Sequence, residues 1–554
     1  MDNQRVLLAI ILSLAILLGY NYLFLPPQPP PSKEPVTASQ VGPEGGETPA
    51  GEVPALAPAG QIQPVPAAPP APAGQPEREA RDIRVDTNLY RAVITENGGG
   101  LKSLSLKKYR EELAEESGPK ELIQESGAID LPLYFSFGAA PTAGQVPLFS
   151  ADTTELQVTE GEQLLTLTTT LDSGIVIQRK MTFHPDSYLI DLAITLHNPS
   201  PEFQYQGAPF LRMVNRPFSA NPNNRFLFNG PVYFQNDSLE EIKPGKLADE
   251  PVSQTGQFDF LGYSGTYFMA AIMPQAEQAT LNLKMLDEER AAITLSEPVV
   301  SLPPGAMKTY NYNVYLGPKK MASLKTAGHN LKAIINFGWF DFLAKPMLVM
   351  LNWLYGYLHN YGWAIILLTV FIKLLFWPLS YKGMKSMKTM QKLQPKMAKL
   401  KEKYGDDRER MSRETMALYQ TYKVNPVGGC MPMLLQIPVF FALYRLLMQT
   451  IELRHAPFMG WITDLSAPDR LFLGFELPIV GGLPVLTLLM GGSMFLQQKM
   501  TPAPADPTQA KVMMFLPVIF TFMFVNFASG LVLYWFVNNL LSIAQQYAIN
   551  KAPD

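Results

Sequence analysis

A lysine stands alone in a long apolar stretch of the chain, where a charged side chain carries a high free-energy cost. Residues 364–380 read AIILLTVFIKLLFWPLS, and Lys373 is the one charged residue among them. A lysine at the centre of a bilayer costs roughly 2.5–3.5 kcal/mol on insertion scales. Two explanations stay open. Five residues before Pro378, the ammonium group can reach water at a membrane surface, or it can attract an anionic group.

Other polar side chains recur in the apolar segments near the end of the chain. Thr369 lies four residues before Lys373, so helical spacing places both on one stripe. Gln436 stands between two prolines, and Asn538 lies in the last apolar segment. Such groups either hold helices together or line a hydrated cavity. The cores of these segments contain no acidic residue, which disfavours a proton or cation pump and favours a cavity that holds a polar or anionic group.

No catalytic set is evident in the sequence. Cys430 is the only cysteine, so the chain cannot form an internal disulfide. His184 and His197 lie in a strand-rich region, where histidines are more often structural, and no catalytic triad, metal-ligand spacing or phosphate-binding loop accompanies them. We expect neither catalytic residues, nor a metal, nor a cofactor. The net charge of −3 over 554 residues excludes a generally basic nucleic-acid binder.

The hydrophobic pattern divides the chain into five parts. An uncharged run at 6–25 has the length that crosses a bilayer and predicts a transmembrane anchor at 1–25. Residues 26–80 hold 16 prolines and predict a disordered linker. Residues 81–330 alternate apolar and polar positions, which predicts one large antiparallel β-sandwich. Residues 331–345 predict an amphipathic interfacial helix, with burial against the sandwich as the alternative. Residues 346–550 form the remaining core.

Charge gives this core an orientation. Five apolar spans are expected near 355–378, 427–448, 478–498, 512–528 and 530–549, which makes six transmembrane helices with the anchor. The loop 379–425 carries 12 Lys and Arg against 5 Asp and Glu, so the positive-inside rule places it in the cytoplasm. Both termini then lie in the cytoplasm, and the β domain lies outside, which in a bacterium is the periplasm.

The basic loop itself, 380–425, is predicted to be a helical hairpin. Apolar residues at steps of three and four, among them Met387, Met390 and Met397, form a coiled-coil-like seam. Pro395 should kink the first arm, and Asp406 with Glu409 resembles a capping box for the second. Packing of the two arms explains the seam by itself. A methionine-rich seam can also adapt to varied apolar partners, and its basic face can attract lipid or RNA phosphates. The lysines expected to make these contacts are Lys392, Lys396 and Lys399.

Several long motifs resemble the YidC/Oxa/Alb family of membrane protein insertases. They are QPKMAKLKEKYGDDRERMSRETMALYQTYKVNPVGGCMPMLLQIPVFFALYRLL, ELRHAPFMGWITDLSAPD, LQQKMTPAPADPTQAKVMMFLPVIFTFMF and SGLVLYWFVNN. The resemblance covers about 330–550, and the anchor, linker and large β domain resemble the Gram-negative form of the family. In that form the β domain looks like a sugar-mutarotase supersandwich.

The resemblance implies a hydrophilic groove that is open to the cytoplasm and to lipid. The family's groove cation is normally arginine, and here its position holds Lys373, while Thr369 matches a threonine at the groove. Tyr534 and Trp535 occupy positions where the family often has two tyrosines. With Gln436 and Asn538, these residues make up the expected client-binding groove.

The function that follows is insertion and chaperoning of integral membrane proteins in the bacterial inner membrane, without enzymatic activity. The expected partners are nascent membrane proteins, the Sec translocon, anionic lipids, and the ribosome or signal recognition pathway through the basic hairpin. The alternative from the residues is a secondary transporter or channel for a small anionic solute, with Lys373 as its site. A third interpretation is a periplasmic sugar-binding or sugar-converting protein that is merely anchored to the membrane, but it leaves the polar groove and the hairpin unexplained.

Overall fold

The computed structural model describes residues 79–551, except for 115, 126, 142–145, 219–226, 405–406, 423–430, 476–480 and 502–506. The anchor expected at 1–25 and nearly all of the linker expected at 26–80 lie outside the described residues. The chain divides into two compact units, 1–58 with 503–516 and 59–502 with 517–554. The larger unit contains both the β domain and most of the helices described below.

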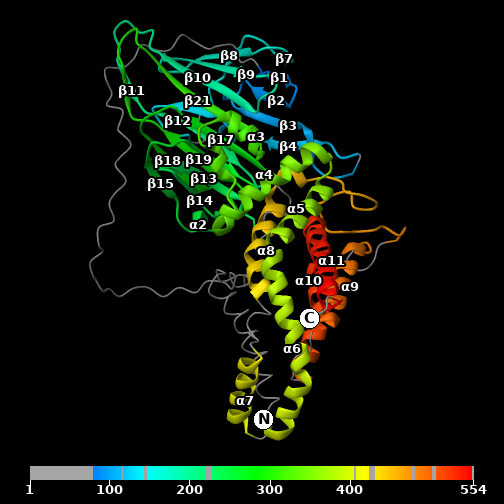
Figure 1. Cartoon of the computed structure of the whole chain (residues 1–554). Coiled ribbons are helices and arrows are strands. Elements are labelled where there is room, and N and C mark those ends of the chain that lie inside the picture. The colour runs from blue at the N-terminus through cyan, green and yellow to red at the C-terminus, as the bar shows by residue number, and fades with distance from the viewer. Residues whose placement is uncertain are drawn as a thin grey trace, which may run out of the picture. The chain divides into compact units, whose positions relative to one another are not determined.

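The β domain is built on one large sheet, with strand order β14-β13-β16-β17-β21-β10-β9-β8-β6 (Figure 1). Two five-stranded sheets, β4-β3-β2-β1-β7 and β15-β18-β19-β12-β5, and the pair β11-β20 complete it. The strands are β1 (Asp82–Thr87), β2 (Tyr90–Thr95), β3 (Leu101–Arg110), β4 (Pro119–Gln124), β5 (Tyr134–Phe137), β6 (Ser150–Ala151), β7 (Glu155–Val158), β8 (Gln163–Thr170), β9 (Val176–Phe183), β10 (Leu189–His197), β11 (Tyr205–Gly207), β12 (Pro209–Asn215), β13 (Gly230–Gln235), β14 (Ser238–Glu241), β15 (Val252–Gly256), β16 (Phe260–Ser264), β17 (Phe268–Pro274), β18 (Ala279–Met285), β19 (Ala291–Ser296), β20 (Val300–Leu302) and β21 (Met307–Pro318).

Alternation of apolar and polar residues explains why these segments form strands. Along β10 every second side chain is buried, and β10 pairs with β21 from Leu189 opposite Tyr315 to His197 opposite Met307. The strand pairs are antiparallel with one exception among the described residues, because β7 runs parallel to β1. A parallel pair needs a long crossover, and the chain from β2 to β6 provides it.

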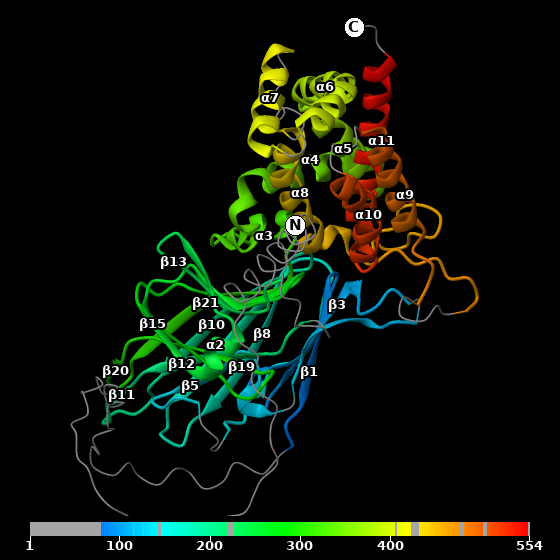
Figure 2. The ribbon, with the colours of Figure 1, turned by 90° about the horizontal axis from the view of Figure 1, so that it is seen from below.

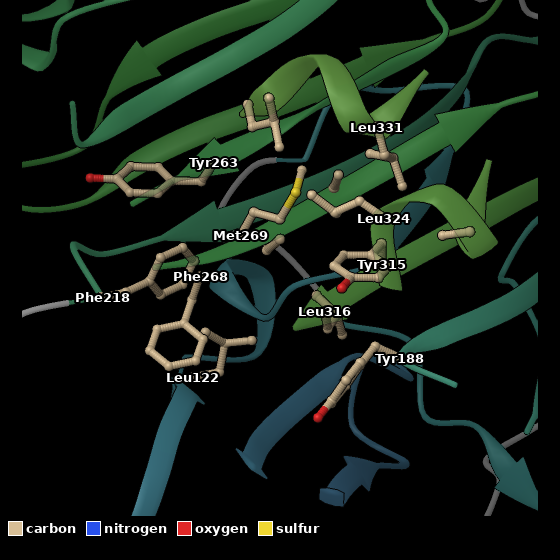
Figure 3. Packing of buried hydrophobic residues seen from close by; sticks show 14 of the residues in the cluster. Leu122, Tyr188, Phe218, Tyr263, Phe268, Met269, Tyr315, Leu316, Leu324 and Leu331 are labelled. Atoms are coloured by element: carbon tan, nitrogen blue, oxygen red, sulfur yellow. The ribbon is translucent and has the colours of Figure 1, made fainter. Parts of the chain in front are cut away.

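Short helices cover part of the large sheet. The helix α3 (Met321–Ala327) and a 3-10 helix at Leu331–Ile334 follow β21 directly. Figure 3 shows Leu324 and Leu331 from these helices in one cluster with Met269 and Tyr315 from the sheet. All four side chains are buried, so the end of the β domain packs onto the sheet through apolar contacts. A further short helix, α2, spans Pro244–Asp249.

The α-helix that follows the β domain begins later than the sequence indicates. The amphipathic helix predicted at 331–345 differs in its bounds, because 3-10 helices at Leu331–Ile334 and Gly338–Phe340 precede the α-helix α4 (Asp341–Leu358). Gly338 has a φ of +67°, which a right-handed helix does not tolerate, so α4 starts after it. The other helices are α5 (Tyr361–Leu375), α6 (Trp377–Tyr404), α7 (Arg408–Thr421), α8 (Met431–Gln449), α9 (Val485–Met500), α10 (Pro507–Phe524) and α11 (Ser529–Lys551).

Helices α5, α8 and α9 all contact α11, and Figures 1 and 2 show α9 beside α11. Taken singly, no helix in the described ranges has both the length and the apolar composition to cross a membrane. The pair α5 and α6 meets both conditions together, with a bend of 66° between its members. The bend falls at Phe376, just before Pro378, which lacks the amide hydrogen needed to continue α5 but fits the first turn of α6.

The predicted hairpin is present as α6 and α7, which contact each other. Leu393 is buried, while Met387, Met390 and Met397 are partly buried. The side chain of Asp407 accepts from the amide of Arg410 at 3.0 Å and so caps α7. The capping residue predicted was Asp406, which lies outside the described residues; Glu409 instead pairs with Arg413 one turn later. The helix α6 continues through Pro395.

Candidate functional site

Lys373 lies in a small polar pocket between three helices of the core. The pocket is lined by residues of α5, α8 and α11, and by the first turn of α6. Four of the predicted site residues meet there, namely Lys373, Gln436, Tyr534 and Asn538. Its volume is about 30 Å³, which holds one or two water molecules rather than a peptide segment. A larger ligand therefore requires these helices to move apart.

The Lys373 ammonium group is held by two side chains of α11. Its Nζ donates to Ser542 Oγ at 2.6 Å and to Asn538 Oδ1 at 3.3 Å. Asn538 and Ser542 are four residues apart and so lie on one face of the helix. The Ser542 hydroxyl in turn donates to the Asn538 carbonyl at 2.8 Å, which leaves its lone pairs directed at the lysine. Ser542 is a site residue that the prediction did not commit to, although its spacing from Asn538 points to it.

Several polar atoms of α11 have hydrogen-bonding capacity to spare. The Tyr534 hydroxyl is buried and faces the Gln436 side chain in the pocket, while both polar atoms of the Gln545 amide are buried and form no hydrogen bond within the described residues. Buried polar groups are normally paired, so each such group carries a free-energy penalty that a suitable partner would remove. Asn539 and Gln546, by contrast, bond across to α9, through Ser493 Oγ at 3.0 Å and the Met500 carbonyl at 2.7 Å.

Two predicted site residues lie elsewhere. Thr369 is buried, and its hydroxyl donates to the Ile365 carbonyl of its own helix at 2.6 Å, so it does not line the pocket. Trp535 packs into an aromatic cluster instead, with its ring 4.7 Å from that of Phe440 and 5.1 Å from that of Phe524. On a helix, neighbouring residues are about 100° apart, so Tyr534 and Trp535 cannot both face the pocket.

The loop between α8 and α9 closes the bundle at the start of α9 and α11. Asp469 is buried and accepts from the Leu486 amide at 2.5 Å, the Thr487 amide at 3.2 Å and Trp461 Nε1 at 2.6 Å. A carboxylate that binds the first amides of a helix also complements the helix dipole. Within the loop, the Asp464 carboxylate accepts a hydrogen bond from the Ser466 amide. The Asp464 carbonyl accepts from Ser529 Oγ at the start of α11. The sequence prediction missed both aspartates, because neither stands next to the start of the helix that it contacts and so no local capping pattern marks them.

The hairpin residues are more accessible. Lys392, Lys396 and Lys399 are exposed, and Lys396 lies over the ring of Tyr422 at the end of α7. Lys388 donates to the Ile549 carbonyl at 3.2 Å and so joins the first arm to the end of α11. In the described part of the chain, no three His, Cys, Asp or Glu side chains gather in a way that could hold a metal ion.

The fold and the pocket together define a protein with a large β-sandwich domain and a helical core that holds a cation among amides and hydroxyls. Two family models match this chain, "YidC periplasmic domain" over residues 82–350 and "60Kd inner membrane protein" over residues 353–554. Their boundary falls within α4. The chain belongs to the YidC/Oxa/Alb family of membrane protein insertases.

Relatives match over almost the whole chain. The membrane protein insertase YidC of Syntrophus aciditrophicus (strain SB) is 44% identical over 99% of this chain and 99% of its own. The protein of the same name from Geotalea uraniireducens (strain Rf4) is 42% identical over 99% of both chains. That from Syntrophobacter fumaroxidans (strain DSM 10017 / MPOB) is 40% identical over 99% of this chain and all of its own.

Proposed function

We propose that this protein inserts integral membrane proteins into the bacterial inner membrane and helps them fold. The observation that carries the proposal is the Lys373 pocket, where a cation is held by exchangeable side chains beside polar atoms that lack partners. Such a site can hold an acidic or polar segment for a short time.

The pocket would act on the part of a client that must cross the membrane. An acidic group of the client replaces Asn538 and Ser542 at the Lys373 ammonium group, and the Tyr534 hydroxyl and the Gln545 amide bind further polar groups. Each such contact offsets part of the cost of removing the client from water. Because the pocket is small, we infer that the client enters as α5 and α11 separate.

The apolar part of the client would move along the outer face of α5. Leu367, Phe371, Leu374 and Leu375 are 43–65% exposed, and Leu374 and Leu375 lie three and four residues after Phe371, which itself lies four after Leu367. This face points away from the buried side of α5, where Ile365 and Leu368 pack. A hydrophobic helix that leaves the pocket can therefore slide between α5 and lipid, and partitioning into lipid would drive insertion.

We infer a topology of six membrane-spanning helices, with the anchor at 1–25 as the first and the core at 346–550 holding the others. The β domain, 81–330, lies in the periplasm, and both termini and the hairpin, 380–425, lie in the cytoplasm. The charge of the hairpin supports this orientation. With α4 at Asp341–Leu358, the interfacial helix includes exposed Trp353 and Tyr357, which suit the level of the lipid headgroups.

The hairpin would receive clients at the cytoplasmic surface. The exposed Lys396 and Lys399 can attract anionic lipids or the phosphates of a ribosome, and the methionines at the seam can adapt to different apolar segments. The Sec translocon and the signal recognition pathway are further proposed partners, which would deliver or share clients.

Reconstitution into liposomes tests this function. The full chain is offered a single-span client with a short acidic tail, and the tail becomes protected from protease when insertion succeeds. We expect protection with the protein and none in empty liposomes. Flux of a small anionic solute without client protection would instead establish the transporter or channel.

A further inference from the structure

A second polar cavity lies at the opposite end of α5 from Lys373, where β3, the segment after β21, the end of α4, the start of α5 and the loop after α8 meet. Its volume is about 480 Å³, within the range of ordinary ligand sites. Its wall carries five basic side chains and one carboxyl group, which are Lys108, Arg110, Lys320, Arg454, His455 and Glu452. All of them belong to the larger compact unit.

The positive charge of this cavity is only partly neutralised. Lys108, Arg110 and Lys320 are exposed, and none of them forms a salt bridge within the described residues. Glu452 is the single carboxyl group of the wall; burial raises its pKa, and Lys320 acts in the opposite direction. Burial and the neighbouring Arg454 lower the pKa of His455. A concave site with this excess of cations favours an anion, because binding neutralises charges that repel one another.

A hydrogen bond and an aromatic ring hold the guanidinium group of Arg454 in place. Its Nη2 donates to the Glu111 carbonyl at 2.7 Å, and the group lies 5.7 Å above the ring centre of Phe268. Phe268 is buried and packs edge-on against Tyr109, another residue of the cavity wall. An arginine held in this way has little side-chain entropy left to lose, so an anion binds it at lower cost.

The other wall of the cavity is aromatic. Tyr355 from the end of α4 and Tyr361 from the start of α5 stack with ring centres 4.0 Å apart. The Tyr361 hydroxyl donates to Asn352 Oδ1 at 3.1 Å. Next to them on α4, Trp353 and Tyr357 are 59% and 72% exposed. Tyrosine and tryptophan gather where a protein meets the headgroup layer of a bilayer.

We propose that this cavity binds the phosphate-containing headgroup of an anionic phospholipid from the periplasmic leaflet. Lys108, Arg110, Lys320 and Arg454 contact the phosphate, and Tyr355 and Tyr361 pack against the glycerol part. The lipid would then join the β domain to the α4–α5 junction. The choice of a lipid over a soluble phosphate rests on the membrane position of α5 in the proposed function. The binding of an anion by the cation cluster does not rest on it.

Binding is measured by titration calorimetry on the full chain in an uncharged detergent, with dioctanoyl phosphatidylglycerol as the probe. We expect saturable binding, weakened about tenfold or more in the double variant Lys108→Gln/Arg110→Gln. Both residues are exposed, so the variant should fold. The matched control is Lys180→Gln/Lys284→Gln, which removes two exposed charges from β9 and β18 and should bind as the wild type does. Glu452→Gln should bind more tightly, because it removes the opposing charge.

Three results would overturn the proposal. Equal binding by the wild type and the Lys108→Gln/Arg110→Gln variant would show that the cations play no part. Equal binding of dioctanoyl phosphatidylcholine would show that net negative charge is not recognised. Tighter binding of inorganic phosphate or of an acidic peptide would assign the cavity to a soluble ligand. None of these results depends on insertion activity, so the test is separate from that of the proposed function.

Discussion

Two cationic side chains in the interior of this chain are held in different ways. Arg179, on β9 of the sandwich, is fully buried, and its guanidinium group donates to two backbone carbonyls, Leu133 at 2.8 Å and Gly98 at 3.4 Å. Lys373, in the helical core, donates to the side chains of Asn538 and Ser542. Backbone carbonyls in a packed sandwich cannot move away, but an amide and a hydroxyl can rotate toward other partners.

The difference separates a structural cation from one suited to binding. Arg179 also lies 5.8 Å from the ring centre of Phe149, and burial lowers its pKa to about 10. The hydrogen bonds to the Gly98 and Leu133 carbonyls offset part of the cost of burying its charge, and they also hold the two loops that carry these carbonyls. Lys373 lies instead beside unpaired polar atoms and next to an exposed apolar helix face. In the proposed function, a client group takes the place of these partners without unfolding the core.

The largest expected effect is on the structural cation. Arg179→Met keeps much of the apolar volume but leaves two buried carbonyls without their donor. We expect the free energy of unfolding to fall by about 2–4 kcal/mol, and the assay is thermal unfolding of the full chain. Arg179→Lys should recover only part of the loss, since a single ammonium group does not span both carbonyls.

Client insertion provides the control for that variant. Below the unfolding temperature, Arg179→Met should insert the acidic-tailed client at the wild-type rate. An Arg179→Met protein that is as stable as the wild type would contradict the structural role of Arg179. A variant that is folded but fails to insert the client would contradict the claim that this role is separate from insertion.

Asp469 is the acidic counterpart of Arg179, since backbone amides hold it. Asp469→Asn retains the size of the side chain but removes the charge at the first amides of α9. We expect a loss of about 1 kcal/mol in the stability of the helical core and faster proteolysis of the loop between α8 and α9. The ratio of insertion between acidic-tailed and neutral-tailed clients should stay unchanged. A change in that ratio would place Asp469 in the binding site.

A smaller, pH-dependent effect is expected at Lys319. This lysine donates to Ser264 Oγ at 3.1 Å and to the Gly265 carbonyl at 3.0 Å, and burial lowers its pKa to about 8. The unfolded chain, with an ordinary lysine pKa near 10.5, binds more protons than the folded chain between pH 8 and 10. Lys319 therefore makes the protein more stable as the pH rises through that range.

Thermal unfolding of the wild type and of Lys319→Gln at several pH values measures this contribution. The difference in stability between the two should move in favour of the wild type from pH 8 to pH 10. Lys284→Gln, at an exposed position of β18, is the control and should show no such trend. A pH-independent difference for Lys319→Gln would mean that Lys319 is hydrated in the folded chain.

The sequence could predict the sandwich because alternation of apolar residues is a local signal that the sheets preserve. It could also bring together Lys373, Gln436 and Asn538, since polar groups in apolar helices must face each other. It could not place Thr369, because a hydroxyl can bond to its own helix instead of to the cavity. Nor could it place Trp535 in the aromatic cluster with Phe440, since that contact depends on how α8 and α11 pack.

The start of α4 could not be predicted from the sequence either. Apolar spacing extends through 331–345, but Gly338 adopts a positive φ, which interrupts an α-helix and which the spacing does not reveal. The size of the pocket at Lys373 could not be foreseen either, because it depends on how closely three helices pack.

The most direct test of a client-binding role for Lys373 combines a charge change at this residue with a charge change in the tail of the client. Lys373 is replaced by Arg, Ala and Glu, and each variant is reconstituted with two clients that differ only in an acidic or an amide-bearing tail. We expect Lys373→Arg to insert both clients, Lys373→Ala to lose several-fold with the acidic tail, and Lys373→Glu to lose about tenfold or more with that tail alone. Equal insertion of the acidic client by all four proteins would contradict a client-binding role and leave Lys373 as a lysine that only reaches toward water.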